Sequence, residues 1–187
     1  TYTIEVEDFI ANMPADGGST VECAAVVTEP TPPSVNDYCG NPITPTGPTL
    51  GGTYVDCEGT ITYTWNYADC EGNNHDWIYT YTIDMTTPPA EVGDPVSTEG
   101  GTVACLTDAT APLTLPVVQD ACGNVLTPAV PANGGDYDGC EGTYTWVYTY
   151  TDCAGQTFDW TYTYTIEVED FIANMPADGG STVECAA

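Results

Sequence analysis

The chain has 187 residues, of which 28 are aspartate or glutamate, one is histidine and none is lysine or arginine, so its formal net charge is −28. Without basic side chains it has nothing to neutralise phosphates, which argues against nucleic-acid binding, and an anionic membrane surface should repel it. No apolar run approaches the length of a membrane span, so we expect no membrane insertion.

Nine cysteines are a heavy use of this residue for a chain of this length. There is no Cys-x-x-Cys pair and only one histidine, so the ligand spacing of a zinc site is missing. Many cysteines in a short chain are typical of disulfide-bonded proteins in oxidising, extracellular surroundings. We therefore expect the cysteines to form disulfides.

Short strands are predicted first, near residues 19–24, 33–36 and 52–56. Aromatic and apolar side chains then alternate with polar ones from Ile61 to Tyr67 and from Trp77 to Ile83. A period of two marks half-buried strands, and the polar, glycine-containing turn DCEGNNHD between them predicts a hairpin. We favour core packing over a sugar-binding platform for the aromatic side chains, because alternation requires only a buried face.

The hairpin sequence returns 83 residues later. CEGTITYTWNYADCEGNNHDWIYTYTI at 57–83 corresponds to CEGTYTWVYTYTDCAGQTFDWTYTYTI at 140–166, which predicts strands at 144–150 and 160–166. NDYCGNPITP and QDACGNVLTP, starting at Asn36 and Gln119, share this offset. The chain's first 25 residues also return unchanged as residues 163–187. The repeating unit is therefore about 80 residues long, the size of a small sandwich domain.

The predicted fold is all-β: tandem immunoglobulin-like antiparallel β-sandwich modules of about 80 residues, stapled by disulfides. Residues 1–8 would be the terminal strand of a preceding module, and residues 1–6 would pack against a neighbouring copy. The other expected segments are module one at 9–84, module two at 85–168, and the start of a third module at 169–187, which repeats 7–25. The proline pair in the linker at 85–94 should make that linker semi-rigid.

These motifs resemble the hyalin repeat (HYR) domains, in particular the four-cysteine HYR-like repeats of giant surface adhesins of Bacteroidetes-type bacteria. The matching stretches are PTPPSVNDYCGNPITP, CEGTITYTWNYADCEGN, WIYTYTI and the inter-repeat phrase MTTPP. The resemblance implies an immunoglobulin-like fold, tandem arrays and a location on the bacterial cell surface. It implies no enzymatic activity.

Four cysteines per module allow three pairings within the module. Cys57 and Cys70 flank one strand that spans about 40 Å when extended, so they should not pair with each other. Of the two remaining options, the immunoglobulin-like strand order favours Cys23–Cys70 with Cys39–Cys57. The matching prediction for module two is Cys105–Cys153 with Cys122–Cys140, and Cys185 would pair with a cysteine of the next module.

Chemistry beyond disulfides has weak support in the sequence. His75, the only histidine, is interpreted as an exposed turn residue, and its counterpart in module two is Phe158, so we expect no enzyme. Calcium takes oxygen ligands, and the acidic candidates are Asp69, Glu71, Asn73 and Asp76 in the hairpin turn with Glu167, Glu169, Asp170 and Asp178 near the following linker. A solvated acidic surface is favoured over a calcium site because Glu71 becomes Ala154 in module two. No cofactor is required, and calcium is the one candidate.

The sequence favours a structural role: a stalk or filament repeat of a secreted cell-surface adhesin, giving reach, stiffness and protease resistance. Its partners would be neighbouring repeats of the same chain or filament. The alternative is a calcium-assisted adhesion module that binds a surface glycan or protein. A cross-β fibre is a third reading of the threonine–aromatic alternation, but the frequent proline, glycine and spaced cysteines favour folded modules.

Overall fold

The structure is a computed structural model that describes residue 2, residues 7–169 and residues 178–180. Within that part of the chain the fold is all-β: strands alternate with three short 3₁₀ helices, and no helix is long and apolar enough to cross a membrane. The chain divides into two compact units. Unit 1 comprises residues 1–93, 117–128 and 150–158, and unit 2 comprises residues 94–116, 129–149 and 159–187.

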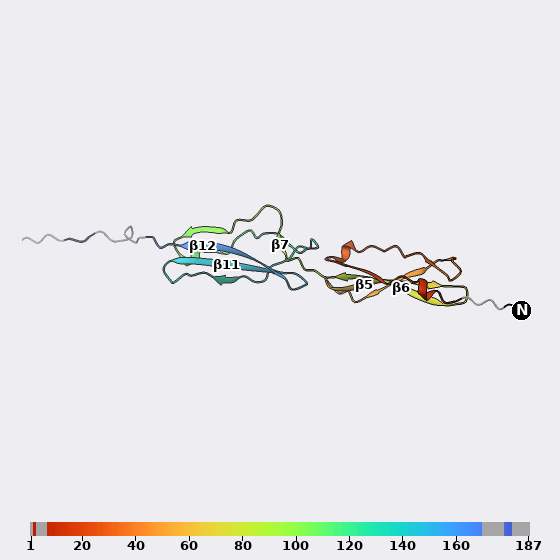
Figure 1. Ribbon diagram of the computed structural model, residues 1–187. Coiled ribbons are helices and arrows are strands. Elements are labelled where there is room, and N and C mark those ends of the chain that lie inside the picture. Colours follow the sequence, from red (N-terminus) through yellow and green to blue (C-terminus); the bar gives the residue numbers. More distant parts are fainter. Residues whose placement is uncertain (1, 3–6, 170–177, 181–187) are drawn as a thin grey trace, which may run out of the picture. The chain divides into compact units, whose positions relative to one another are not determined.

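The main sheet of unit 1 is built on the predicted hairpin. β5 (Gly59–Ala68) and β6 (Asn74–Ile83) are antiparallel in continuous register from the Gly59–Ile83 pair to the Ala68–Asn74 pair (Figure 1). β4 (Thr46–Gly52) and β1 (Gly17–Val21) complete the order β1-β6-β5-β4. β2 (Val35–Asn36) pairs with β3 (Pro42–Ile43) in a second small sheet, and the helical turns are η1 (Phe9–Asn12) and η2 (Ala24–Val26).

Two expectations about the strands need correction. β1 runs parallel to β6, whereas a purely antiparallel sandwich was predicted. Parallel pairing requires a long crossover, and here four strands of the chain separate β1 from β6. The strand expected at 52–56 instead ends at Gly52, because Gly52 and Asp56 both adopt positive φ and the chain turns there into β5.

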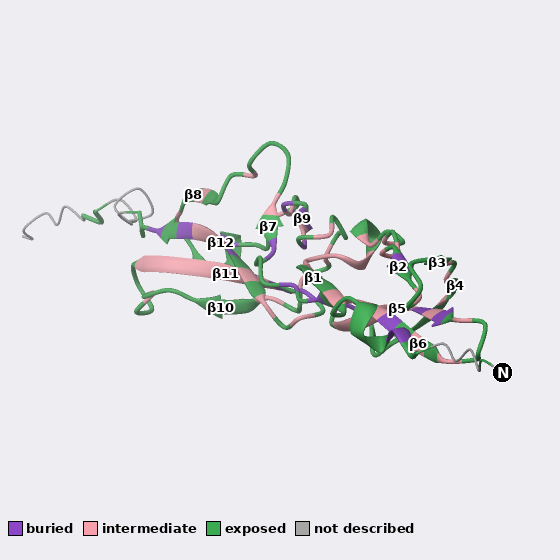
Figure 2. Cartoon of the chain, turned by 45° about the vertical axis from the view of Figure 1, so that its right-hand side comes forward, coloured by how far each residue is buried: buried purple, intermediate pink, exposed green. Residues whose placement is uncertain are grey.

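The aromatic face of the hairpin forms the core of unit 1. Trp65 and Trp77 are direct cross-strand partners with ring centroids 5.4 Å apart, and they pack with Phe9, Val35 and Tyr67. Figure 2 shows buried positions along β5 and β6. The core-packing interpretation is thus confirmed for these tryptophans and for Tyr67, which is fully buried.

The second four-stranded sheet repeats this plan with β10 (Ala132–Gly134), β11 (Gly142–Thr151), β12 (Thr157–Ile166) and β8 (Glu99–Val103), in that order. β8 is parallel to β12, as β1 is to β6. β7 (Ala90–Glu91) pairs with β9 (Val118–Gln119), and η3 spans Leu106–Asp108. The hairpin predicted for module two is confirmed.

Candidate functional site at the repeat junction

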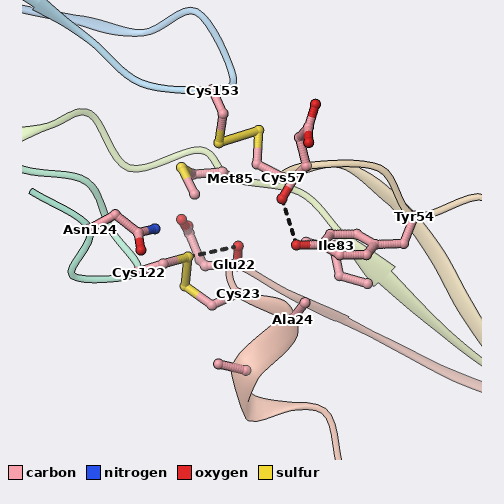
Figure 3. A pocket seen from close by; sticks show the side chains of 12 residues that line it. Glu22, Cys23, Ala24, Tyr54, Cys57, Ile83, Met85, Cys122, Asn124 and Cys153 are labelled. Carbon is pink, nitrogen blue, oxygen red and sulfur yellow. Dashed lines mark hydrogen bonds between the residues drawn. A yellow bond between two sulfur atoms is a disulfide. The ribbon is translucent and has the colours of Figure 1, made fainter. Parts of the chain in front are cut away.

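Two disulfides connect the first repeat to two loops of the second. Cys23 is bonded to Cys122 and Cys57 to Cys153, with Cα atoms 5.6 Å and 5.9 Å apart. All four cysteines belong to unit 1, and both bonds line one pocket (Figure 3). We call this region, comprising the cysteine-bearing end of the first repeat, the linker and loops 117–128 and 150–158, the junction.

The strand register brings Cys23 and Cys57 to the same end of the sheet. Val21, the last residue of β1, and Gly59, the first residue of β5, both pair with Ile83 at the end of β6. Cys23 follows β1 by two residues and Cys57 precedes β5 by two. The parallel pairing of β1 therefore places Cys23 at the end of β6, and the antiparallel pairing of β5 places Cys57 there; the linker continues from this end.

The loop that carries Cys122 is a turn organised by Asp120. The Asp120 carboxylate accepts hydrogen bonds from the backbone N–H groups of Cys122 and Asn124, both at 2.9 Å, and from the Asn124 side-chain amide at 2.8 Å. Burial raises the pKa of Asp120, but these hydrogen bonds outweigh that effect and hold it below its ordinary value. The sulfur of Cys122 is thus presented by a turn with a fixed conformation.

The loop that carries Cys153 follows the same design around Asp152. The Asp152 carboxylate accepts a hydrogen bond from the backbone N–H of Gln156 at 2.8 Å, and the backbone carbonyl of Asp152 accepts one from the N–H of Gly155. The side chain of Gln156 donates to the carbonyl of Met85 in the linker at 2.8 Å. Asp152 Oδ2 is buried without a hydrogen-bond partner among the described residues. Gln156 thus binds the linker and leaves this oxygen unpaired.

Glu22 anchors the start of the linker. Its carboxylate accepts hydrogen bonds from the backbone N–H and the hydroxyl of Thr86, at 3.1 and 2.6 Å, and from the same groups of Thr87, at 3.2 and 3.1 Å. The bond from the Thr86 hydroxyl is the largest of the effects that lower the pKa of Glu22. The linker therefore leaves the first repeat in a conformation held by a charged side chain.

In a comparison with protein families, one family matches both repeats. The family described as HYR-like domain with 4 cysteines matches residues 11–83 and 95–166. The chain belongs to this HYR-like family. None of the curated proteins compared with the chain matches it.

The cysteine pairing of these HYR-like repeats corrects the sequence prediction. The predicted bonds Cys23–Cys70, Cys39–Cys57, Cys105–Cys153 and Cys122–Cys140 are wrong, because the observed bonds join different repeats. Cys39, Cys70, Cys105 and Cys140 are exposed free thiols, and Cys185 lies outside the described residues.

The length of β5 explains why the predicted pairing within a repeat fails. Ten strand residues, about 33 Å, separate the Cys57 end from the Cys70 end, and Cys23 lies at the Cys57 end. Cys39 follows β2, whose Val35 packs in the core with Tyr67, near the Cys70 end. The expectation that each module pairs its own cysteines put bonding partners at opposite ends of a rigid sheet.

The acidic calcium candidates of the hairpin turn are engaged in the turn itself. The Asp69 carboxylate accepts from the Asn73 side chain and from the backbone N–H groups of Glu71 and Asn73, and the Asn73 side-chain bond is the largest effect that lowers the Asp69 pKa. Asp76 accepts from the Asn66 amide at 2.7 Å.

Elsewhere the calcium candidates are scattered. Glu167, Glu169 and Asp178 are exposed, and Asp170 lies outside the described residues. Over the part of the chain that the structure describes, no group of three or more His, Cys, Asp or Glu residues could hold a metal ion.

His75 differs from the sequence interpretation. It lies in β6, half-buried, with its ring against Phe9 and its Nε2 2.6 Å from the carboxylate of Asp8. The hydrogen bond from His75 lowers the pKa of Asp8. His75 thus connects Asp8, which precedes the first repeat, to the hairpin. The prediction of an exposed turn residue did not include this contact.

A second pocket lies in unit 2. Tyr162 and Tyr164, whose ring centroids are 5.4 Å apart, line it together with Leu113, whose side chain is fully exposed. Desolvation raises the pKa of Tyr162. Aromatic rings beside an exposed apolar side chain form a surface against which a flat ligand such as a sugar ring can stack.

Proposed function

We propose that the chain is a structural segment of an extracellular surface protein, in which HYR-like repeats are joined end to end as a stalk or filament of a bacterial adhesin. The observation that carries the proposal is that both disulfides cross from one repeat to loops of the next. Disulfides of this kind persist in oxidising surroundings, which supports an extracellular location. No catalytic role is proposed.

The junction contains three covalent connections: the linker peptide and the two disulfides. Domains joined by a peptide alone move relative to one another by default, unless their interface is large. Each disulfide here closes a loop of nearly one hundred residues, with sequence separations of 99 and 96. On the chain-entropy model, one such loop lowers the free energy of the folded state relative to the unfolded chain by about 4–5 kcal/mol. The cross-links thus restrict the junction and stabilise the fold together.

The composition suits the same role. Because the chain has no lysine or arginine, trypsin has no cleavage site in it. Its net charge of −28 repels neighbouring chains of the same kind, which opposes collapse and aggregation. Resistance to proteases and mutual repulsion are properties that a surface stalk needs.

Reduction tests the structural role. We expect reductant to lower the Tm of the 187-residue chain and to make the linker at 85–94 cleavable by proteinase K, because both disulfides then release the junction. The double substitutions Cys23→Ser with Cys122→Ser, and Cys57→Ser with Cys153→Ser, remove one bond each without leaving a lone thiol and should give intermediate results. An unchanged Tm and an uncut linker after full reduction contradict the proposal. Antibody labelling of intact cells against lysed cells tests the surface location separately.

Ligand binding is the second candidate function, and the tyrosine-lined pocket of unit 2 is the observation in its favour. Glycan-array binding that is lost in Tyr162→Ala, with Tyr2→Ala at an exposed tyrosine as the matched control, would support an adhesion module. Loss of binding on chelation would add calcium to that role. Binding that both variants retain would place the ligand elsewhere.

A further inference from the structure

Each exposed cysteine is the sequence equivalent of a cysteine that is bonded at the junction. Cys39 and Cys70 correspond to Cys122 and Cys153, because both pairs are separated by the 83-residue offset. Cys105 and Cys140 correspond to Cys23 and Cys57. In the described chain the first and third cysteines of the first repeat bond forward to the second and fourth cysteines of the second repeat. We call the first and third positions forward-bonding and the second and fourth positions backward-bonding.

The two turns with backward-bonding cysteines are already shaped for bonding in the first repeat. The Asp37 carboxylate accepts from the backbone N–H and side chain of Asn41, at 2.7 and 2.8 Å, as the Asp120 carboxylate does from Asn124. The turn around Cys70 repeats the carbonyl bond of the Cys153 turn: Gly72 N–H donates to Asp69 as Gly155 N–H does to Asp152. Cys39 and Cys70 thus sit in preformed turns of the bonded kind.

The forward-bonding position of the second repeat is preformed as well. Cys105 precedes η3 with φ and ψ of −137° and 147°, and Cys23 precedes η2 with −131° and 133°. Val103 pairs with Ile166 at the end of β12, as Val21 pairs with Ile83 at the end of β6. Cys105 therefore lies at the end of its sheet, as Cys23 does.

Three residues of the junction are more buried than their equivalents in the other repeat. At the junction, Asp120, Asp152 and Cys57 are buried, with 8, 6 and 5% of their surface exposed. Their equivalents Asp37 and Asp69 are half-buried, and Cys140 is exposed. Asp120, Asp152 and Cys57 are thus more deeply buried at the junction than their equivalents in the other repeat.

We infer that the four exposed cysteines form further disulfides between successive repeats, and that their partner is another copy of this repeat in the same chain. We call this series of inter-repeat disulfides the disulfide ladder, and each disulfide in it a rung. Cys39 and Cys70 bond to the first and third cysteines of a preceding repeat. Cys105 and Cys140 bond to the second and fourth cysteines of a following one. The inference rests on the proposed function only for the tandem array, which the return of residues 1–25 at 163–187 supports.

Each rung forms by two-electron oxidation of two thiols. One thiolate attacks a disulfide oxidant such as oxidised glutathione, and the second thiolate then displaces the glutathione from the mixed disulfide. One protein S–S bond is made, the two cysteines release two protons, and the oxidant is reduced to two thiols. Oxidising extracellular surroundings supply an oxidant of this class.

A longer chain that contains the whole 187-residue chain tests the ladder. Residues 1–162 followed by residues 1–187 keep the repeats in register across the join, because 163–187 equals 1–25, and they add eight cysteines. After refolding in a glutathione buffer, the monomer is isolated and digested without reduction, with a protease that cleaves at Glu or aromatic residues. We expect Cys105–Cys39 and Cys140–Cys70 peptides, and no more free thiols than in the 187-residue chain.

Single substitutions serve as matched controls. In the longer chain, Cys105→Ser in the first copy should free one thiol, that of Cys39 in the second copy, and leave the Cys140–Cys70 bond in place. Since Cys105 is exposed, this variant should fold, which near-UV circular dichroism checks. Cys39–Cys70 or Cys105–Cys140 bonds at the new junction, or four additional free thiols there, overturn the inference. Those results would not contradict the proposed surface location. Absence of the protein from the cell surface would in turn not contradict the proposed disulfides.

Discussion

At the scale of single residues, Glu22 shows how a charged side chain directs the junction. Four donors of Thr86 and Thr87 point at its carboxylate, and no other charge is involved. Hydrogen bonds to an ionised acceptor are stronger than those between neutral groups. The second repeat has Ala104 at the equivalent position and Gln156 where the first repeat has Asn73. The two repeats therefore differ at the positions that contact the linker in this junction.

Replacing Glu22 by glutamine tests this anchor. Hydrogen bonds lower the folded-state pKa of Glu22 below its ordinary value of 4.5, so its stabilising effect is complete above the unfolded pKa and is lost as pH falls through the folded pKa. We expect Glu22→Gln to lower the Tm at pH 7, and the difference from the unmodified chain to shrink below about pH 4. Thermal melts at several pH values measure it.

Glu29→Gln, at an exposed glutamate, is the control for the change in net charge. Equal effects of the two substitutions at pH 7 would show that Glu22 acts through charge alone, and a difference that persists in acid would contradict the assignment of its bonds to the carboxylate.

At the scale of elements, the β5–β6 hairpin determines both the core and the site. Its aromatic face packs Trp65 against Trp77, and its two ends separate the forward-bonding cysteines from the backward-bonding ones. The alternating pattern predicted this hairpin to within a few residues. It could not predict β4, because TGPTLGG has low strand propensity and forms an exposed edge strand through pairing with β5.

Loss of the tryptophan pair should lower the free energy of unfolding of the first repeat far more than a substitution on the other face of the same strand. We expect Trp65→Ala to cost about 3–5 kcal/mol, because it removes a large side chain that is 3% exposed. Thr64→Ala, one residue away on the opposite face of the strand, should cost less than about 1 kcal/mol. Denaturant unfolding followed by tryptophan fluorescence measures both. Similar losses for the two variants would show that the aromatic face is not the core.

At the scale of the whole molecule, net charge sets the background on which the disulfides act. With 28 acidic groups and no basic side chain, the folded chain repels itself, and the cross-links hold it against that repulsion. Hydrogen bonds lower the pKa of the turn aspartates Asp37, Asp69 and Asp120, so these carboxylates keep their charge. Salt should therefore stabilise this protein.

Salt titration separates screening from a calcium site. Raising NaCl from about 0.01 M to about 0.15 M shortens the Debye length from about 30 Å to about 8 Å, and we expect the Tm to rise. CaCl₂ at the same ionic strength should give a similar Tm if the acidic surface is only solvated. A saturable rise at much lower calcium concentration would instead support a specific site among the acidic candidates.

The repeat length, the all-β class and the core hairpin could be predicted from the amino-acid sequence, because they depend on local alternation and on copies that can be compared directly. It also supported the disulfides, since cysteine number and spacing are readable. The pairing of the cysteines follows from the tertiary structure. That choice depends on the end of the sheet at which each thiol lies, and the parallel pairing of β1 with β6 places Cys23 beside Cys57, within reach of the second repeat and a full strand length from Cys70.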